Sequence, residues 1–433
     1  MKKVLFITYY WPPSGGSGVQ RPLKFVKYLQ QYGWMPVVYT SKGGEYFEID
    51  HSLEAEVPKN IKILKTKPTE PYALFKMITG KKKDDKLVAG YMHQKKSNSW
   101  AEKLSMWVRS NLFVPDARML WISPSVHYLS KYIAKHQINA IVTTGPPHSM
   151  HLIGMALKKK HHIPWLADFR DPWTQIDYWE DLKMTDWVRN MHIKLEKMVL
   201  QTADKVVCVS RTWGQGLENN SGIHVDIISN GFDEEDIQHT QNVSRDTQFS
   251  LVHIGMMGKS RNHEVFWQAV SSVCAEDEDI KKDLIVKLYG KNDPSVIESI
   301  AKYNLNKQVE IYPYIPHYEI VGIQQKAQVL YLSVNRTANA QGILTGKIYE
   351  YLAARRPILC IGPVSGEAAQ VIYDTNTGLV SDFDDLTALK ANIRTLYQHY
   401  KEHKDYVKFS NIEIYSRKYQ TKQLAELLNC ISP

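Results

Sequence analysis

The chain alternates short apolar runs with longer amphipathic segments along its whole length. The apolar runs are nearly continuous, which is typical of parallel strands that are covered by helices on both faces. The runs predict strands at Val4–Tyr10, Pro36–Thr40, Ile61–Lys65, Ala140–Thr144, Trp165–Phe169, Lys205–Ser210, Val225–Ser229, Ser250–Ile254, Leu284–Tyr289, Val309–Tyr312, Val329–Val334 and Pro357–Ile361. The pattern therefore predicts an α/β protein.

Helical segments lie between these strands, for example Leu23–Tyr32 and Val188–Thr202, whose apolar residues recur at helical spacing. Alternating strands and helices indicate crossover units and parallel sheets. The polar stretch 230–246 interrupts the alternation, and a chain of 433 residues exceeds the usual size of one domain. We therefore expect one domain over residues 1–230 and a second over residues 231–409.

The composition is that of a globular protein, with 43% hydrophobic and 23% charged residues. No run of 18 apolar residues occurs, so the sequence predicts no membrane-spanning helix. The cysteines, Cys208, Cys274, Cys360 and Cys430, are scattered in a way that fits neither a zinc site nor a disulfide framework. We expect no metal site and a cytoplasmic location.

Positive charge is concentrated in the first half of the chain. Residues 1–230 contain 32 lysines and arginines against 20 acidic residues, whereas residues 231–433 contain 22 against 25. Part of this excess surrounds an aromatic segment in which Trp100, Leu104 and Trp107 follow helical spacing. The basic residues nearest to that segment are Lys81, Lys82, Lys83, Lys95, Lys96, Lys103 and Arg109.

An aromatic stripe with basic flanks predicts peripheral attachment to an anionic membrane surface, here the inner face of the plasma membrane. Each basic residue contributes about 1 kcal/mol to such binding. An ordinary solvated face is the alternative interpretation of the same residues. Nucleic acid is not an expected partner, because the sequence contains no nucleic-acid module signature.

The stretch 345–359 contains the most informative motif. A turn at Gly346 leads into a helix whose first turns place Lys347 and Glu350 on one face, and Pro357 lies beyond its end. The N–H groups of the helix N-terminus and Lys347 suit the phosphates of a nucleoside diphosphate, while Glu350 can accept hydrogen bonds from ribose hydroxyls. An ordinary amphipathic helix with a surface lysine and a capping glutamate is the alternative.

A second turn of this kind follows the first strand. Residues 14–18 read Ser-Gly-Gly-Ser-Gly and precede an expected helix at Leu23–Gln31, so Gly16 and Gly18 allow the backbone to approach a ligand closely. The spacing differs from the G-x-G-x-x-G dinucleotide fingerprint. We expect the two turns to lie in different domains and to face each other across a cleft.

Polar clusters also follow two neighbouring strands of the first domain. His148 comes after the strand at 140–144, and Asp168, Arg170 and Asp171 come at the end of the next. The carboxyl ends of parallel strands share one edge of a sheet, where ligands bind in open α/β folds. A helix-capping role for His148 and a structural ion pair between Arg170 and Asp171 are the alternatives.

With these motifs the chain resembles a retaining glycosyltransferase of family 4, which has the glycosyltransferase-B architecture of two facing Rossmann-like domains. The resemblance covers essentially the full length. The matching segments are the glycine loop 17–20 with Gly33, the end of the first domain at 195–210 and 228–233, the donor-phosphate loop 252–261, and the donor-binding helix 346–359. The resemblance also implies that a C-terminal helix, about 410–433, packs on the first domain.

The resemblance implies transfer of a sugar from a UDP- or GDP-linked donor, with retention of the anomeric configuration and without a required metal or other cofactor. The catalytic residues are then His148, Arg261 and Lys347. The donor-binding residues are Gly16, Gly18, Gly255, Arg261, Tyr314, Ile315, Thr345, Gly346, Lys347 and Glu350. The acceptor-side residues are Arg21, Asp168, Arg170 and Asp171.

The chain departs from the family pattern at two places. The family's second acid, eight residues before Glu350, is replaced by Gly342, which bears on recognition of the donor sugar. The arginine that follows the phosphate-loop glycine is Met256, and the lysine five residues further on is Arg261. One cation is therefore lost, and Lys347 is the residue expected to replace its charge.

For the mechanism we expect attack of the acceptor hydroxyl on the same face of the sugar from which the diphosphate leaves. Stabilisation of that leaving group by Arg261 and Lys347 is the main catalytic term. The expected acceptor is a glycan or lipid-linked sugar in surface polysaccharide assembly. A nucleotide-sugar epimerase and an inactive nucleotide-sugar-binding protein are the alternatives; Gly342 argues against the epimerase.

Overall fold

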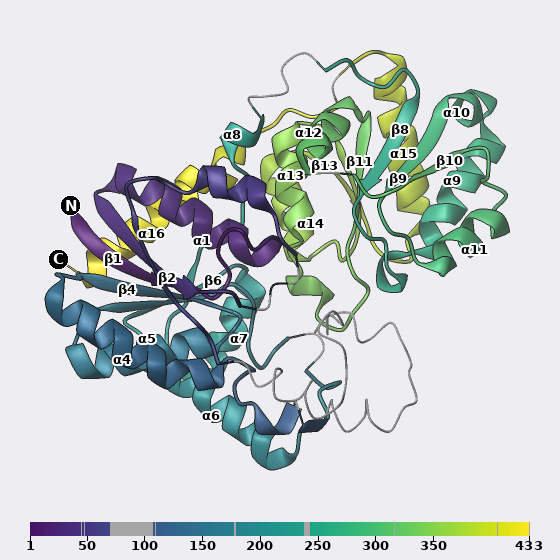
Figure 1. Ribbon diagram of the computed structural model, residues 1–433. Helices are drawn as coiled ribbons and strands as arrows, with labels where there is room; N and C mark the ends of the chain where they lie inside the picture. The colour runs from purple at the N-terminus through teal and green to yellow at the C-terminus, as the bar shows by residue number, and fades with distance from the viewer. Residues whose placement is uncertain are drawn as a thin grey trace. The chain divides into compact units, whose positions relative to one another are not determined.

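The computed structural model describes residues 1–44, 46, 48–69, 107–108, 110–176, 179–237, 243–315, 317–404 and 406–432. The chain divides into two compact units (Figure 1): unit 1 contains residues 1–229 and 420–433, and unit 2 contains residues 230–419. Each unit contains a parallel sheet with helices on both faces. The predicted α/β class with two Rossmann-like domains is thereby confirmed.

Unit 1 is built on a seven-stranded parallel sheet in the order β3-β2-β1-β4-β5-β6-β7. Its strands are β1 (Lys2–Ile7), β2 (Trp34–Ser41), β3 (Lys62–Thr66), β4 (Ala140–Gly145), β5 (Trp165–Phe169), β6 (Lys205–Cys208) and β7 (Asp226–Ile227). Its α-helices in the described ranges are α1 (Ser17–Tyr28), α4 (Met119–Lys135), α5 (Ser149–His161), α6 (Asp186–Thr202), α7 (Arg211–Ser221) and α16 (Arg417–Ile431).

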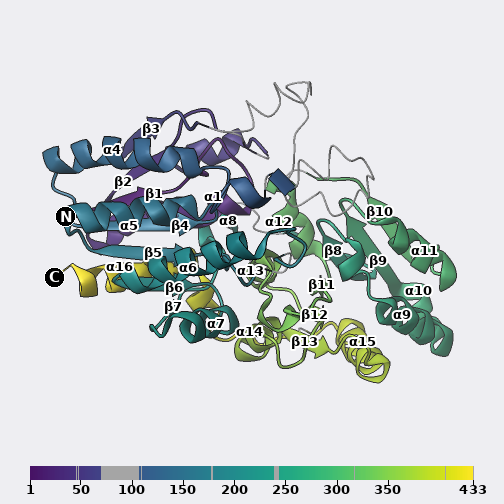
Figure 2. The same cartoon turned by 90° about the horizontal axis from the view of Figure 1, so that it is seen from below.

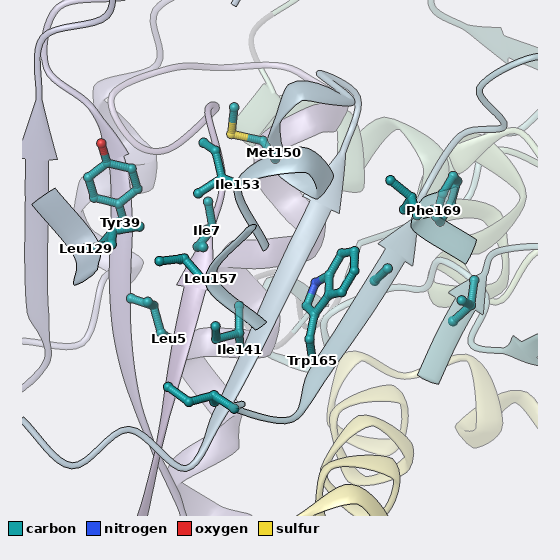
Figure 3. Close-up of a cluster of buried hydrophobic side chains, with 14 of the residues drawn as sticks. Leu5, Ile7, Tyr39, Leu129, Ile141, Met150, Ile153, Leu157, Trp165 and Phe169 are labelled. Atoms are coloured by element: carbon teal, nitrogen blue, oxygen red, sulfur yellow. The ribbon is translucent and has the colours of Figure 1, made fainter. Parts of the chain in front are cut away.

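The central strands of this sheet are buried on both faces because they are apolar at consecutive positions. Successive side chains of a strand point to opposite faces, and in β1 Leu5 and Ile7 belong to one core while Val4 and Phe6 belong to another. Figure 3 shows the first of these cores, in which residues of β1 and β4 pack with Ile153 of α5. The second core lies under α1 and α16.

The C-terminal helix α16 completes this second core. Leu424 and Leu428 are buried with Val4 and Phe6, and Leu427 packs against the same cluster at its edge. The apolar stripe of α16 is therefore covered by the sheet of unit 1, although most of the sequence between that sheet and the helix belongs to unit 2.

Unit 2 is built on a six-stranded parallel sheet in the order β10-β9-β8-β11-β12-β13, which can be followed in Figure 2. Its strands are β8 (Phe249–Ile254), β9 (Leu284–Tyr289), β10 (Val309–Tyr312), β11 (Val329–Ser333), β12 (Ile358–Ile361) and β13 (Gly378–Ser381). Its α-helices in the described ranges are α8 (Glu234–Ile237), α9 (Glu264–Glu276), α10 (Glu278–Asp283), α11 (Pro294–Lys302), α12 (His317–Lys326), α13 (Gly346–Ala354), α14 (Glu367–Thr375) and α15 (Leu386–Lys401).

The predicted strands all coincide with observed ones, most of them with shifted ends, but two elements differ from expectation. Helix α1 begins at Ser17 instead of Leu23, so Gly18 lies inside its first turn. Strand β13 was not predicted, because its only fully buried residue is Ser381 and it contains no apolar run. None of the helices in the described ranges combines the length and hydropathy needed to cross a bilayer.

Candidate active site

Helix α13 begins as the motif predicts. Thr345 is its N-cap, and the Thr345 hydroxyl oxygen accepts a hydrogen bond of 3.2 Å from the N–H of Lys347. Gly346, the first helical residue, is exposed. The positive end of the helix dipole therefore lies at the protein surface, with Lys347 in the first turn.

The Lys347 side chain lies over Gly255, which directly follows β8. A Cβ atom added to Gly255 would lie 3.0 Å from both Cε and Nζ of Lys347. Gly255 also has a φ of 101°, a conformation that side-chain-bearing residues rarely adopt. A glycine at this position is therefore what allows the ammonium group to approach the end of β8.

Lys347 is held there by a histidine that the sequence did not single out. Nε2 of His253, in β8, lies 3.1 Å from Nζ of Lys347. Nδ1 of His253 lies 3.1 Å from the carbonyl oxygen of Tyr331. Because a carbonyl only accepts, Nδ1 carries the proton and Nε2 accepts from Lys347. Burial and the neighbouring Lys347 hold the pKa of His253 well below its ordinary value, so this imidazole is neutral.

Arg261 places a second cation in this region. Its Nε donates to Oδ1 of Asn335, and its Nη1 donates to the carbonyl oxygen of Met256 at 3.3 Å. Burial, with a further contribution from Arg261, lowers the pKa of Lys347 to about 7, although Glu350 acts in the opposite direction. The two cations are thus close enough to repel each other, and a bound anion would relieve that repulsion.

The remaining donor-side residues lie on α13 and in the loop after β10. Glu350 is exposed, and its Oε2 accepts a hydrogen bond of 3.2 Å from Nε2 of Gln324 in α12. Tyr314, 73% exposed, and the half-buried Ile315 follow the end of β10. Unit 2 therefore brings together Gly255, Arg261 and the start of α13, with a carboxylate one turn further on. Buried Gly342 contributes no side chain.

In unit 1, two of the predicted acceptor-side residues form a buried ion pair. Arg21 is 1% exposed and Asp168 is 2% exposed, and Nε and Nη2 of Arg21 donate to the carboxylate at 2.9–3.1 Å. The hydroxyl group of Thr144 also donates to Asp168, and Nη1 of Arg21 donates to the carbonyl oxygen of Ser229. The pair therefore joins α1, β4 and β5 to Ser229, where the first segment of unit 1 ends. Direct contact of these residues with an acceptor stays a prediction.

In the glycine loop of unit 1, residues 14–18, one glycine packs closely against another residue of the same unit. A Cβ added to Gly18 would lie 2.7 Å from Nη1 of Arg170, whereas one added to Gly16 would meet no atom within 4 Å. Arg170 in turn donates to Asp171 at 3.0 and 3.2 Å. The structure thus accounts for a glycine at position 18 by packing against Arg170, while Gly16, at φ 86°, caps α1 beside open space.

His148 is the N-cap residue of α5, and its ring stacks on Trp173 with a centroid distance of 4.7 Å. Burial, followed by the neighbouring His151, holds the pKa of His148 well below its ordinary value. Its buried Nδ1 has no hydrogen-bond partner among the residues that the structure describes. His148 is therefore a neutral imidazole with a free nitrogen, which suits a hydrogen bond to a hydroxyl better than an acid role.

The described residues include no group of three His, Cys, Asp or Glu side chains that could hold a metal ion. Residues 70–106 lie outside the described residues, and so does Arg109. This segment contains Trp100, Leu104 and all the lysines named for the predicted membrane face.

Comparisons with known proteins support the assignment that the resemblance implied. A model described as "Glycosyltransferase Family 4" matches residues 97–236, and one described as "Glycosyl transferases group 1" matches residues 234–411. The first match lies mainly in unit 1 and the second in unit 2. The chain is a family 4 glycosyltransferase. A glycosyltransferase of this architecture takes its sugar from a nucleotide-sugar, which is a substrate and not a bound cofactor.

Solved structures share the fold over the whole chain at low sequence identity. A glycosyltransferase from Rickettsia africae is 15% identical with a TM-score of 0.62, covering 99% of this chain and 98% of its own. A variant of S. aureus TarM, solved with UDP, fondaparinux and α-GlcNAc-glycerol, is 12% identical with a TM-score of 0.59, covering 99% and 100%. A Listeria monocytogenes protein assigned as a UDP-N-acetylglucosamine 2-epimerase is 11% identical with a TM-score of 0.55, covering 98% of this chain and 95% of its own. No curated protein sequence gives a significant match.

Replacing Asp168 with Asn should strongly destabilise this glycosyltransferase, because it leaves the buried guanidinium of Arg21 without a counter-charge. Breaking one partner of a buried pair costs about 3–5 kcal/mol, which corresponds to a fall in Tm of roughly 6–20 °C for a unit of this size. The control is Asp171→Asn, whose side chain is 39% exposed and pairs with Arg170. Equal Tm values for the two variants in calorimetry would contradict a structural role for the Arg21–Asp168 pair.

Proposed function

We propose that this glycosyltransferase moves a sugar, with retention of configuration, from a UDP- or GDP-linked donor to a glycan or lipid-linked acceptor in surface polysaccharide assembly. The observation that carries the proposal is the convergence of Gly255, Arg261 and Lys347 at the start of α13. The two cations contact a neutral imidazole, a side-chain amide and a backbone carbonyl. Their charge is thus available to a diphosphate.

This arrangement suits departure of a nucleoside diphosphate. As the bond from the sugar to the terminal phosphate oxygen breaks, negative charge develops on that oxygen, and Lys347, Arg261 and the dipole of α13 are placed to stabilise it. The same oxygen can take the proton of the attacking acceptor hydroxyl, so no protein nucleophile is required. In this scheme His148 donates or accepts a hydrogen bond at the sugar and carries no charge. Retention follows from attack on the face that the diphosphate leaves.

The nucleoside is proposed to bind beside Glu350. This exposed carboxylate lies one turn after Lys347 on α13, a distance along the helix that suits two ribose hydroxyls when the phosphates lie at the N-terminus. Tyr314, which is 73% exposed in the loop after β10, offers an aromatic ring for the base. The UDP bound to the TarM variant makes UDP the first nucleotide to test.

The proposal is tested by incubating the purified protein with UDP-glucose, UDP-N-acetylglucosamine and GDP-mannose without an acceptor. We expect slow release of free nucleoside diphosphate from one of them, because a transferase site lets water replace the acceptor. A double variant, Arg261→Met with Lys347→Met, should release none. The Listeria neighbour keeps an epimerase open, and that activity would appear as a new nucleotide-sugar. Binding without either product would indicate an inactive binding protein.

Replacing Glu350 with Ala should weaken UDP or GDP binding by about 10- to 100-fold, because it removes charge-assisted hydrogen bonds to the ribose. The fold should be unaffected, since Glu350 is exposed. Calorimetric titration measures the affinity, and Glu298→Ala, an exposed carboxylate on α11, is the control. An affinity for the Glu350 variant equal to that of the control would remove Glu350 from the site.

We further propose that unit 1 contacts an anionic membrane surface at the inner face of the plasma membrane. Trp107 is 44% exposed, Leu112 58% and Trp187 70%. Asn111 links these positions, because its side chain bonds the carbonyl of Trp107 and the N–H of Thr185. Aromatic side chains at the surface of a basic unit suit the headgroup region of a bilayer. Trp121, which lies further along the chain in α4, is fully buried and belongs to the core instead.

A double variant, Trp107→Ser with Trp187→Ser, should bind vesicles that contain an anionic lipid several-fold more weakly than the wild-type protein does. Wild-type binding should also weaken as salt rises, because surface charges are screened beyond about 10 Å at 0.1 M salt. Co-sedimentation measures both effects, and Tyr373→Ser, at a half-exposed tyrosine of unit 2, is the control. If the wild-type protein binds no vesicles at any salt concentration, the membrane proposal is wrong and a soluble acceptor is favoured over a lipid-linked one.

A further inference from the structure

His253 is a polar residue in an otherwise apolar strand. It is 1% exposed, and β8 is buried along its whole length. A buried imidazole needs hydrogen-bond partners, and here the Tyr331 carbonyl takes the Nδ1 proton while Nε2 is directed at Lys347. A histidine in this tautomer accepts a hydrogen bond from either form of a lysine, because both –NH₃⁺ and –NH₂ can donate.

The surroundings of Lys347 disfavour its charge in the free protein. His253 faces it from β8 and is neutral, Arg261 faces it from the 3₁₀ turn Lys259–Arg261 and repels it, and Glu350 on its own helix attracts it. Burial is the largest of these effects, and together they lower the pKa of Lys347 to about 7. Near neutral pH both forms of Lys347 are therefore present, and above it the neutral amine predominates.

We propose that His253 positions the Lys347 side chain in both its neutral and its protonated form, and that binding of a diphosphate is coupled to uptake of one proton by Lys347. This inference rests on the proposed function, since it concerns the same phosphate site. The balance is simple: the lysine –NH₂, one proton from solvent and the diphosphate give –NH₃⁺ paired with the diphosphate. The proton returns to solvent when the nucleotide leaves.

Electrostatics predicts that nucleotide binding raises the pKa of Lys347. An anion within a few ångströms favours the protonated form of an amine, so the bound-state pKa of Lys347 rises. The terminal phosphate of UDP is already ionised at pH 8, since the second phosphate pKa is about 6. Any proton taken up on binding at pH 8 is therefore assigned to the protein and not to the nucleotide. Between the free and the bound pKa of Lys347, affinity should fall by up to about tenfold for each unit of pH, because only the protonated amine pairs with the phosphates.

The test is calorimetric titration with UDP and with GDP at pH 8, in HEPES and in Tris, whose ionisation enthalpies differ. The dependence of the observed enthalpy on the buffer enthalpy gives the number of protons taken up. We expect close to one proton for the wild-type protein and close to zero for Lys347→Arg. The arginine variant is the matched control, because it keeps the positive charge but does not titrate. Its affinity should also stay level from pH 7 to pH 9, whereas wild-type affinity falls.

His253→Gln tests the positioning role. The amide can replace one hydrogen bond but not the rigid link from Tyr331 to Lys347, so we expect reduced proton uptake together with several-fold weaker binding. This variant replaces a buried residue, and the conclusion therefore rests on the wild-type and Lys347→Arg proteins if it does not fold.

Two results would overturn the coupling and leave the proposed function intact: nucleotide binding by the wild-type protein without proton uptake, or uptake that persists in Lys347→Arg. Absence of binding by UDP and GDP, together with absence of donor hydrolysis, would overturn the proposed function and the coupling with it.

Discussion

Burial of parallel strands on both faces is the constraint from which the rest of the structure follows. A strand such as β8, with apolar residues at consecutive positions, needs helices above and below it, and each helix must return the chain to the same end of the sheet. All strand ends and the helix starts near them then share one edge. Gly255, which follows β8, and Lys347, in the first turn of α13, meet for this reason although they are far apart in the sequence.

The two units use charge in opposite ways at these edges. In unit 1, Arg21 and Asp168 satisfy each other in the interior, with further bonds to Thr144 and Ser229. Such a pair fixes the packing of neighbouring elements and leaves little for a ligand. In unit 2, Lys347 and Arg261 are held by groups that carry no formal negative charge. Cations whose hydrogen-bond partners among the described residues carry no negative charge are suited to an anionic ligand, and this contrast is the reason for proposing that the donor phosphates bind to unit 2.

Most of the fold could be predicted from the sequence, because short apolar runs that alternate with amphipathic segments leave few alternatives for a chain of this composition. The start of α13 was also predictable, since Thr345 and Pro357 mark the boundaries of that helix. Other features depend on contacts between distant residues and leave no local signal. The helical start at Ser17 is one of these, because a glycine and a proline inside a helix locally favour a loop. The membership of His253 in the site is another, because a histidine in an apolar run looks the same whether it faces a core or a ligand.

The departures from the family pattern can be understood from the same geometry. Met256 brings no charge to the loop after Gly255, but its backbone carbonyl accepts from Arg261, which keeps that guanidinium near the end of β8. Lys347 reaches the same place from α13 and lies over Gly255. A lysine that enters from the helix start is necessarily closer to the buried end of β8 than a side chain of the exposed loop is. Its charge is therefore more costly in the free protein, and a neutral hydrogen-bond acceptor such as His253 stabilises it there without neutralising the site.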